Sequence, residues 1–195
     1  MYLSQIELKK FSPYADGIKA HSFIESTFSE EFINGDNRTR KVWRLDKIYG
    51  KTYLLLLSQT KPNKEKIEQH AVKDSLKTTD YNKFLENLDT NRNYRFKLKL
   101  NPIKRNNGKE RSIRDEELIP YFYEKIKNKG FKIDSQTLMI TEKGQIDFID
   151  SKTCPSATFE GFLKITNLEK FKETLITGIG RKKAYGFGML TIIPI

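Results

Sequence analysis

The chain has 195 residues, among them 36 Lys and Arg, 25 Asp and Glu and one Cys, and its formal net charge is +11. A hydrophobic fraction of 37% is enough for a packed core, which excludes wholesale disorder, and the single cysteine excludes an intramolecular disulfide and a cysteine-based zinc site. The longest apolar run, residues 54–57, is far shorter than the roughly 20 residues of a membrane helix, and the alternating N-terminus predicts a strand, not a signal peptide. We expect a soluble, cytoplasmic protein that does not associate with membranes and that binds a polyanion.

Strand and helix patterns follow one another through the first half of the chain. Residues 2–8 alternate as a strand does, and a helix is predicted from Asp16 or Gly17 to about Phe28, with Asp16 as its N-cap. The remaining predictions are strands over 41–48 and 52–59 joined by a short connection with Gly50, a helix over 61–69, a strand over 71–78, a helix over 80–88 and a linker at 89–91.

The second half repeats this order. Apolar residues at 94, 96, 98 and 100 alternate with Arg95, Lys97 and Lys99, which predicts a strand with one buried face and one row of cations. The remaining predictions are a loop at 106–108, a helix over 116–129 ended by Gly130, strands over 131–140, 145–149 and 157–165, a helix over 168–175 with Asn167 as N-cap, a glycine-rich segment over 178–188 and a strand over 189–195.

The order of elements indicates an α+β protein of two tandem ferredoxin-like (RRM-like, βαββαβ) domains. The boundaries predicted for them are residues 1–90, which hold the helix with His21, and residues 91–195, which hold the basic strand, a basic loop over 104–114 and the glycine-rich segment.

The positive charge is concentrated in one stretch. Residues 95–114 contain eight Lys or Arg and a single acid, Glu110, whereas residues 1–94 are nearly balanced. A run of charge is most often a solvated face, but so one-sided a run within a strand and loop favours nucleic acid as the partner.

The segment TGIGRKKAYGFGML, residues 177–190, is not a dinucleotide-binding fingerprint, because a helix precedes it and a strand follows it, and it lacks the G-K-[ST] of a phosphate-binding P-loop. Glycines let backbone N–H groups approach a phosphodiester, and Arg181, Lys182 and Lys183 place cations beside them. The alternative is a helix C-cap at Gly178 followed by a solvated turn.

Two histidines are candidates for chemistry. On a helical wheel His21 lies at the edge of the apolar face, where packing can hold a side chain whose ring faces a groove; the alternative is a structural or surface residue. His70 lies among charged residues and is predicted to be a surface residue. No spacing of Asp, Glu and His resembles a metal site, and we expect no cofactor.

These features together resemble one known family. The segments MYLSQIEL, KVWRLD, YRFKLKLNPIKR, FEGFLKI and GIGRKKAYGFGML, with the His21 helix between the first two, run from end to end in the order found in CasE, the CRISPR precursor-RNA endoribonuclease of the type I-E Cascade complex. The resemblance implies metal-independent cleavage at the 3′ base of the repeat stem-loop, products with a 2′,3′-cyclic phosphate (or 3′-phosphate) and a 5′-hydroxyl, retention of the guide RNA, and partners that are this RNA and the other Cascade subunits. Outside that complex we expect a monomer.

The same resemblance makes His21 catalytic. The family often has a Tyr three residues earlier, where this sequence has Ile18, with Tyr14 one turn further back; Tyr14, Lys19 and Ser29 are candidate helpers. Candidate RNA-binding residues are Lys97, Lys99, Lys104, Arg105, Lys109, Arg111, Arg114, Gly178, Gly180, Arg181, Lys182 and Lys183. The alternatives are a non-catalytic RRM-type protein that binds the stem-loop and a general basic DNA-binding protein.

Overall fold

The computed structural model describes residues 1–10, 12–13, 17–33, 38–106, 109–147 and 153–195. The chain forms two compact units: unit 1 comprises Met1–Asn87 with Ala184–Gly186, and unit 2 comprises Leu88–Lys183 with Phe187–Ile195. Among the described helices, none is both long and apolar enough to span a membrane.

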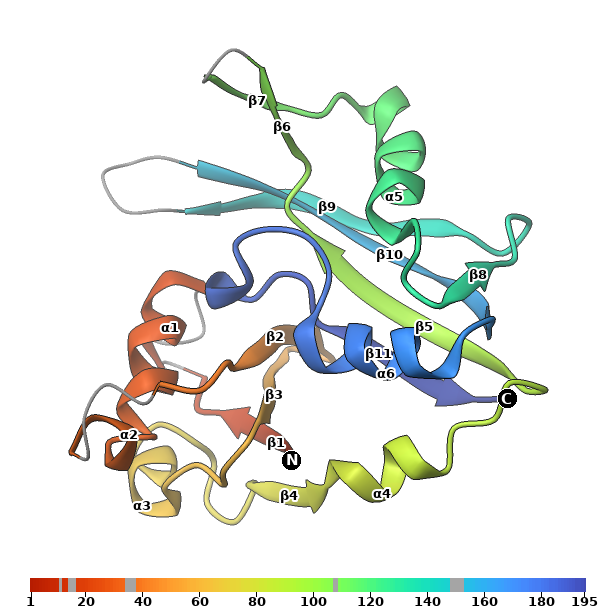
Figure 1. Cartoon of the computed structure of the whole chain (residues 1–195). Coiled ribbons are helices and arrows are strands. Elements are labelled where there is room, and N and C mark those ends of the chain that lie inside the picture. Colours follow the sequence, from red (N-terminus) through yellow and green to blue (C-terminus); the bar gives the residue numbers. More distant parts are fainter. Residues whose placement is uncertain (11, 14–16, 34–37, 107–108, 148–152) are drawn as a thin grey trace. The chain divides into compact units, whose positions relative to one another are not determined.

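Unit 1 is built around a four-stranded antiparallel sheet with the order β2-β3-β1-β4 (Figure 1). This order, with a helix after β1 and another after β3, is that of a ferredoxin-like domain. Its elements are β1 (Tyr2–Leu8), α1 (Gly17–Ser26), α2 (Glu30–Ile33), β2 (Val42–Ile48), β3 (Lys51–Ser58), α3 (Lys64–Glu68), β4 (Lys77–Asp80) and α4 (Tyr81–Glu86).

The core of unit 1 joins α1 to the sheet. Ala20 and Ile24 of α1 and Trp43 of β2 are each no more than 1% exposed and belong to one hydrophobic cluster. Burial of these side chains fixes the position of α1 because a helix this short derives most of its stability from packing an apolar face.

A buried cation supports the same unit. The Lys41 side chain is 2% exposed, and its Nζ lies 2.7 Å from Glu31 Oε2 and 3.4 Å from Glu25 Oε2. Burial acts to raise the pKa of Glu31, but hydrogen bonds from Lys41 and Thr39 outweigh it and hold that pKa below its usual value. The lysine is therefore satisfied within its own unit.

Unit 2 contains a sheet with the order β11-β5-β10-β8, in which β9 also pairs with β10, and a separate hairpin, β6–β7, which projects beyond that sheet (Figure 1). The strand order repeats the ferredoxin-like order of unit 1. Its elements are β5 (Asn93–Leu100), β6 (Ile103–Asn106), β7 (Lys109–Ser112), the 3-10 helix η2 (Asp115–Glu117), α5 (Leu118–Ile126), β8 (Phe131–Ile133), β9 (Met139–Asp147), β10 (Thr153–Ile165), α6 (Leu168–Thr177), the 3-10 helix η4 (Lys183–Tyr185), whose last two residues belong to unit 1, and β11 (Leu190–Pro194).

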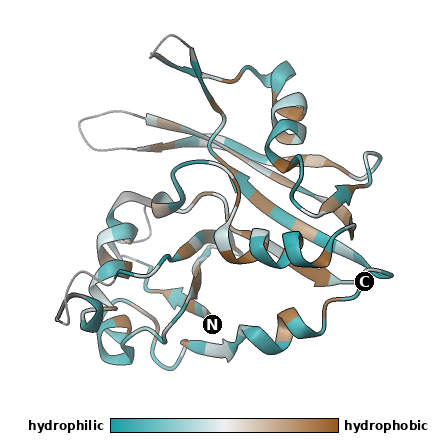
Figure 2. Ribbon diagram, in the orientation of Figure 1, coloured by the Kyte–Doolittle hydropathy of each residue, from teal (hydrophilic) through white to brown (hydrophobic). Residues whose placement is uncertain are grey.

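The alternation predicted for β5 is confirmed. Its apolar residues are at most 2% exposed, and the intervening cations lie on the other face of the sheet, a pattern visible as alternating bands along β5 in Figure 2. The buried face packs on α5, where the Phe122 ring lies 4.7 Å from that of Phe159 and 5.9 Å from that of Phe96, centroid to centroid. Unit 2 thus has an apolar face under α5 and a charged face opposite it.

A tyrosine of α5 closes this core. Tyr121 donates a hydrogen bond of 2.7 Å from its hydroxyl to the carbonyl of Asn101. Burial raises the pKa of Tyr121 to about 12. The phenol is therefore held in its neutral form in the folded protein.

Several predicted boundaries were wrong. The stretch expected to be a basic loop, 104–114, is mostly the β6–β7 hairpin, with Lys104 opposite Arg111 and Asn106 opposite Lys109. The strand predicted over 71–78 is β4, six residues later, and α5 ends at Ile126 because Lys127 is extended (ψ 129°), not at Gly130. The caps at Asn167 and Gly178 are confirmed, whereas the Asp16 cap lies outside the described residues.

Candidate active site and nucleic-acid-binding residues

His21 lies on α1, one residue after the buried Ala20. Its side chain is half-buried, as its predicted place at the edge of the apolar face requires. Phe23 and Ile24 on the next turn are buried, so α1 cannot rotate about its axis without exposing them. The backbone of His21 is therefore fixed, and its ring remains accessible in part.

The ring of His21 packs against an aromatic residue from the far end of the chain. Tyr185, in η4, places its ring 5.6 Å from the imidazole, centroid to centroid, with the two planes tilted by 55°. Tyr185 is half-buried and belongs to unit 1, like His21. This separation and tilt are typical of a favourable aromatic pair.

Gly186 holds this tyrosine in place. Its φ is +83°, and a Cβ at this position would lie 2.8 Å from Cζ3 of Trp43, closer than side-chain atoms approach one another. The absence of a side chain thus lets the backbone rest on the indole of Trp43. Because Trp43 also packs in the cluster that contains Ala20 and Ile24, His21 and Tyr185 are supported by the same core.

Of the other candidate catalytic residues, the structure describes Lys19 and Ser29. Tyr14 lies outside the described residues. Lys19 is exposed and lies two residues from His21, about 200° around the helix, whereas Ser29 is half-buried and lies beyond the C-terminal end of α1. His70, predicted to be on the surface, is half-buried and packs edge-on against Phe23, with ring centroids 5.4 Å apart.

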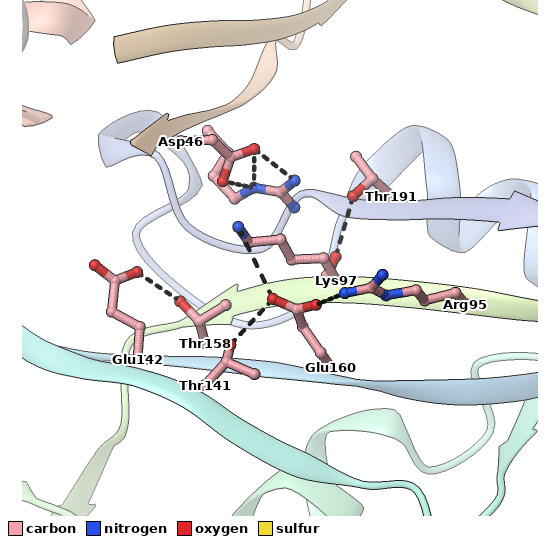
Figure 3. Close-up of polar contacts among 9 residues, drawn as sticks. Asp46, Arg95, Lys97, Thr141, Glu142, Thr158, Glu160 and Thr191 are labelled. Carbon is pink, nitrogen blue, oxygen red and sulfur yellow. Dashed lines mark hydrogen bonds and ion pairs between the residues drawn. The ribbon is translucent and has the colours of Figure 1, made fainter. Parts of the chain in front are cut away.

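The cation row of β5 contacts one acid of the neighbouring strand. Arg95 donates a hydrogen bond of 2.9 Å to Glu160 of β10, and Lys97 Nζ lies 4.0 Å from the same carboxylate (Figure 3). Thr141 of β9 also donates to Glu160, at 3.1 Å. In the register of β5 and β10, Lys97 lies opposite Glu160 and Lys99 lies opposite Thr158, so a single acid of β10 faces the three cations of this row.

The β6–β7 hairpin carries cations on both faces. Lys104 and Arg111 share one face, where Arg111 donates two hydrogen bonds of 3.2 Å to Glu117 and thereby lowers the pKa of that carboxyl. Arg105 lies on the opposite face and is exposed, beside Glu110 across the hairpin. Arg114, also exposed, lies 4.0 Å from Glu116, and only the backbone of Lys109 is described.

The glycine-rich segment directs two of its three cations inward. Lys182 donates a hydrogen bond of 3.3 Å to the thiol of Cys154, and burial raises the pKa of that thiol. Lys183 donates to the carbonyl of Thr177 at 2.9 Å, which satisfies the C-terminal end of α6. Arg181 is the exposed member of the three. Gly178 and Gly180, which precede them, have positive φ of 71° and 84°.

Sequence reasoning missed Tyr185 as a neighbour of His21. The only local signal is an aromatic residue within a glycine-rich and basic segment, and nothing in that segment points to α1. Among the described residues, no group of three or more His, Cys, Asp and Glu side chains is placed to hold a metal ion.

Comparisons with known proteins identify both a family and a fold. A family described as CRISPR associated protein matches residues 1–194, and no curated protein matched. Among solved structures, Thermus thermophilus Cse3 bound to an RNA representing a pre-cleavage complex is 23% identical, with 99% of this chain and 98% of that chain covered and a TM-score of 0.82. Cas6e from Escherichia coli K-12 is 20% identical over 100% of both chains, with a TM-score of 0.70. A chain of a CRISPR RNA-guided surveillance complex is 16% identical over 100% of both chains, with a TM-score of 0.64. These likenesses confirm the predicted fold of two tandem ferredoxin-like domains.

Proposed function

The chain belongs to the family of CRISPR associated proteins, and on that basis we propose that it is a cytoplasmic, metal-independent endoribonuclease that cleaves CRISPR repeat RNA at the 3′ base of its stem-loop. The observation that carries the proposal is the placement of His21, half-buried on a helix whose backbone is fixed by the core and with its ring against Tyr185. The fold shared with Cse3, which has been solved bound to an RNA representing a pre-cleavage complex, supports it.

The reaction requires two proton transfers and no external oxidant or reductant. The 2′-oxygen of the nucleotide before the cut forms a bond to phosphorus while the bond from phosphorus to O5′ breaks, which leaves a 2′,3′-cyclic phosphate and a 5′-hydroxyl. The proton of the 2′-hydroxyl leaves and O5′ gains one, so protons balance. An imidazole can accept or donate a proton, so His21 is assigned one of these transfers, and water, a lysine or Tyr14 is assigned the other.

Unit 2 supplies the cations for RNA binding. Arg105, Arg114 and Arg181 are exposed and are assigned to phosphates, whereas Lys182 and Lys183 support the shape of the glycine-rich segment. An A-form stem hides its base edges in a deep, narrow groove, so recognition relies on phosphates, 2′-hydroxyls and shape. The projecting β6–β7 hairpin is the element assigned to that groove.

The cleaved stem-loop stays bound, and the protein joins the other Cascade subunits together with the guide RNA. The relative solved in a surveillance complex supports this partner assignment. A slow cleavage step is compatible with this role, because a protein that keeps its product does not need rapid turnover.

The test is incubation of the full chain with repeat RNA in the presence of EDTA. The proposal predicts cleavage that continues in EDTA and stops when the 2′-hydroxyl at the cut is replaced by hydrogen. Tight binding with RNA that stays intact would favour the non-catalytic RNA-binding alternative. Equal competition by duplex DNA would favour a general DNA-binding protein.

A further inference from the structure

The His21 ring needs support that α1 does not supply. Burial of Ala20 and Ile24 fixes the helix backbone, but the imidazole still has two side-chain torsions, with about three staggered states for the first and two for the second. A group that transfers a proton must spend its time in one of these states, since its nitrogen has to face the reacting oxygen.

Tyr185 is placed to select that state. Its ring lies against the imidazole at 5.6 Å with a 55° tilt, an arrangement that stabilises an aromatic pair and blocks rotation of His21 into the volume that Tyr185 fills. Tyr185 is itself held, because the next residue, Gly186, rests on the buried Trp43. Trp43 and α1 belong to one core, so the two rings are held relative to each other by packing.

We propose that Tyr185 is a positioning residue that holds the His21 imidazole in the orientation needed for proton transfer. The inference rests on the proposed function of His21 and adds to it a residue from the glycine-rich segment. The aromatic ring carries the effect through its contact with the imidazole. Tyr185 is therefore expected to act on the rate of cleavage and not on the affinity for RNA.

The test compares Tyr185→Leu, which removes the ring, with Tyr185→Phe, which keeps it. Single-turnover cleavage of repeat RNA at saturating protein is expected to slow about tenfold in Tyr185→Leu. Free rotation of the imidazole among all its states would cost roughly sixfold in rate, and displacement of a catalytic group would cost roughly 100-fold, so the expected loss lies between these limits. The dissociation constant for the stem-loop stays within about twofold, and Tyr185→Phe restores the rate.

Proton NMR supplies a second readout that does not depend on cleavage. The chain has two histidines, so their ring signals are easily assigned. The signals of His21 are expected to move in Tyr185→Leu and to stay near their wild-type positions in Tyr185→Phe. His70, which packs on Phe23, is the internal control and remains unchanged in both variants.

The outcomes separate the inference from the proposed function. If the wild type cleaves the RNA and Tyr185→Leu cleaves it at the same rate, the positioning role alone is overturned. The same holds if Tyr185→Phe loses as much cleavage rate as Tyr185→Leu. Wild-type protein that binds the stem-loop without cleaving it overturns the proposed function and the positioning role together. His21 signals that do not move in Tyr185→Leu overturn the contact on which the inference rests.

Discussion

Replacement of Gly186 by alanine tests the support beneath the candidate active site. A methyl group at this position would meet the indole of Trp43 at 2.8 Å, on a backbone with φ of +83°. The left-handed conformation costs an alanine about 1–2 kcal/mol, and overpacking against a buried ring costs about 1–3 kcal/mol. Gly186→Ala is therefore expected to lower the free energy of unfolding of unit 1 by about 2–5 kcal/mol.

Gly50→Ala is the matched control. Gly50 has φ of +75°, close to that of Gly186, but a Cβ there would have no atom within 4 Å. This variant carries the backbone cost without the clash, so it is expected to lose only about 1–2 kcal/mol. The difference between the two variants measures the contact with Trp43.

Tryptophan fluorescence is the assay for both variants. Trp43 is the only tryptophan of the chain and lies in the core of unit 1, so urea unfolding followed by its emission reports on that unit. In Gly186→Ala the native emission is also expected to shift, because the added methyl group displaces the indole from its packed position. Equal stabilities of the two variants and an unchanged native emission would refute the packing of Gly186 on Trp43.

Three further predictions concern charged and polar groups. Glu31→Gln is expected to cost about 3 kcal/mol in urea unfolding at pH 7, because it breaks the principal contact of a buried lysine, whereas Glu68→Gln, in an exposed pair, costs about 0.3–0.5 kcal/mol. Since folding lowers the pKa of Glu31, its contribution to the free energy of unfolding is present above about pH 4.5 and is lost as the pH falls through the pKa of the folded state. A stability difference between the wild type and Glu31→Gln that stays undiminished at low pH would contradict this assignment. Tyr121→Phe is expected to cost about 0.5–1.5 kcal/mol, because the buried carbonyl of Asn101 loses one of its two donors and keeps the backbone N–H of Ile103. Since folding raises the pKa of Tyr121, the wild type loses stability as the pH rises from 10 towards about 12; an equally steep loss in the variant would show that another group is responsible. Arg105→Gln is expected to weaken stem-loop binding and to reduce the slope of log affinity against log salt concentration by about 1. The control is Lys127→Gln, which changes another exposed cation. If the two variants have the same slope, Arg105 does not contact a phosphate.

Local sequence patterns predicted the elements that depend on local physics. The alternation from Tyr94 to Leu100 identified β5 and its buried face, and Asn167 identified the start of α6, whose end matches the alternative interpretation of Gly178 as a C-cap. Each of these signals acts within a few residues, since strand periodicity and helix capping are local properties. The sequence did not indicate the β6–β7 hairpin, because its strands, Ile103–Asn106 and Lys109–Ser112, are short and mostly polar.

The candidate site depends on contacts between distant segments, which sequence patterns do not report. The basic run from Arg95 to Arg114 looked one-sided, yet two acids outside the run, Glu160 and Glu117, pair with Arg95 and Arg111. In the same way, nothing in the glycine-rich segment indicates that Tyr185 lies against His21. Charge balance and aromatic contacts of this kind follow from tertiary packing, so they required the structure.

The role of His21 is the central claim, and single-turnover cleavage of repeat RNA by His21→Ala and His70→Ala tests it most directly. Both variants remove an imidazole that is half-buried in unit 1, and His70 serves as the control because it packs on Phe23 and has no proposed part in the chemistry. We predict that His21→Ala binds the stem-loop as the wild type does but loses cleavage by about 100-fold or more, as expected for removal of a general acid or base, while His70→Ala still cleaves. Cleavage by His21→Ala at the wild-type rate would contradict the account.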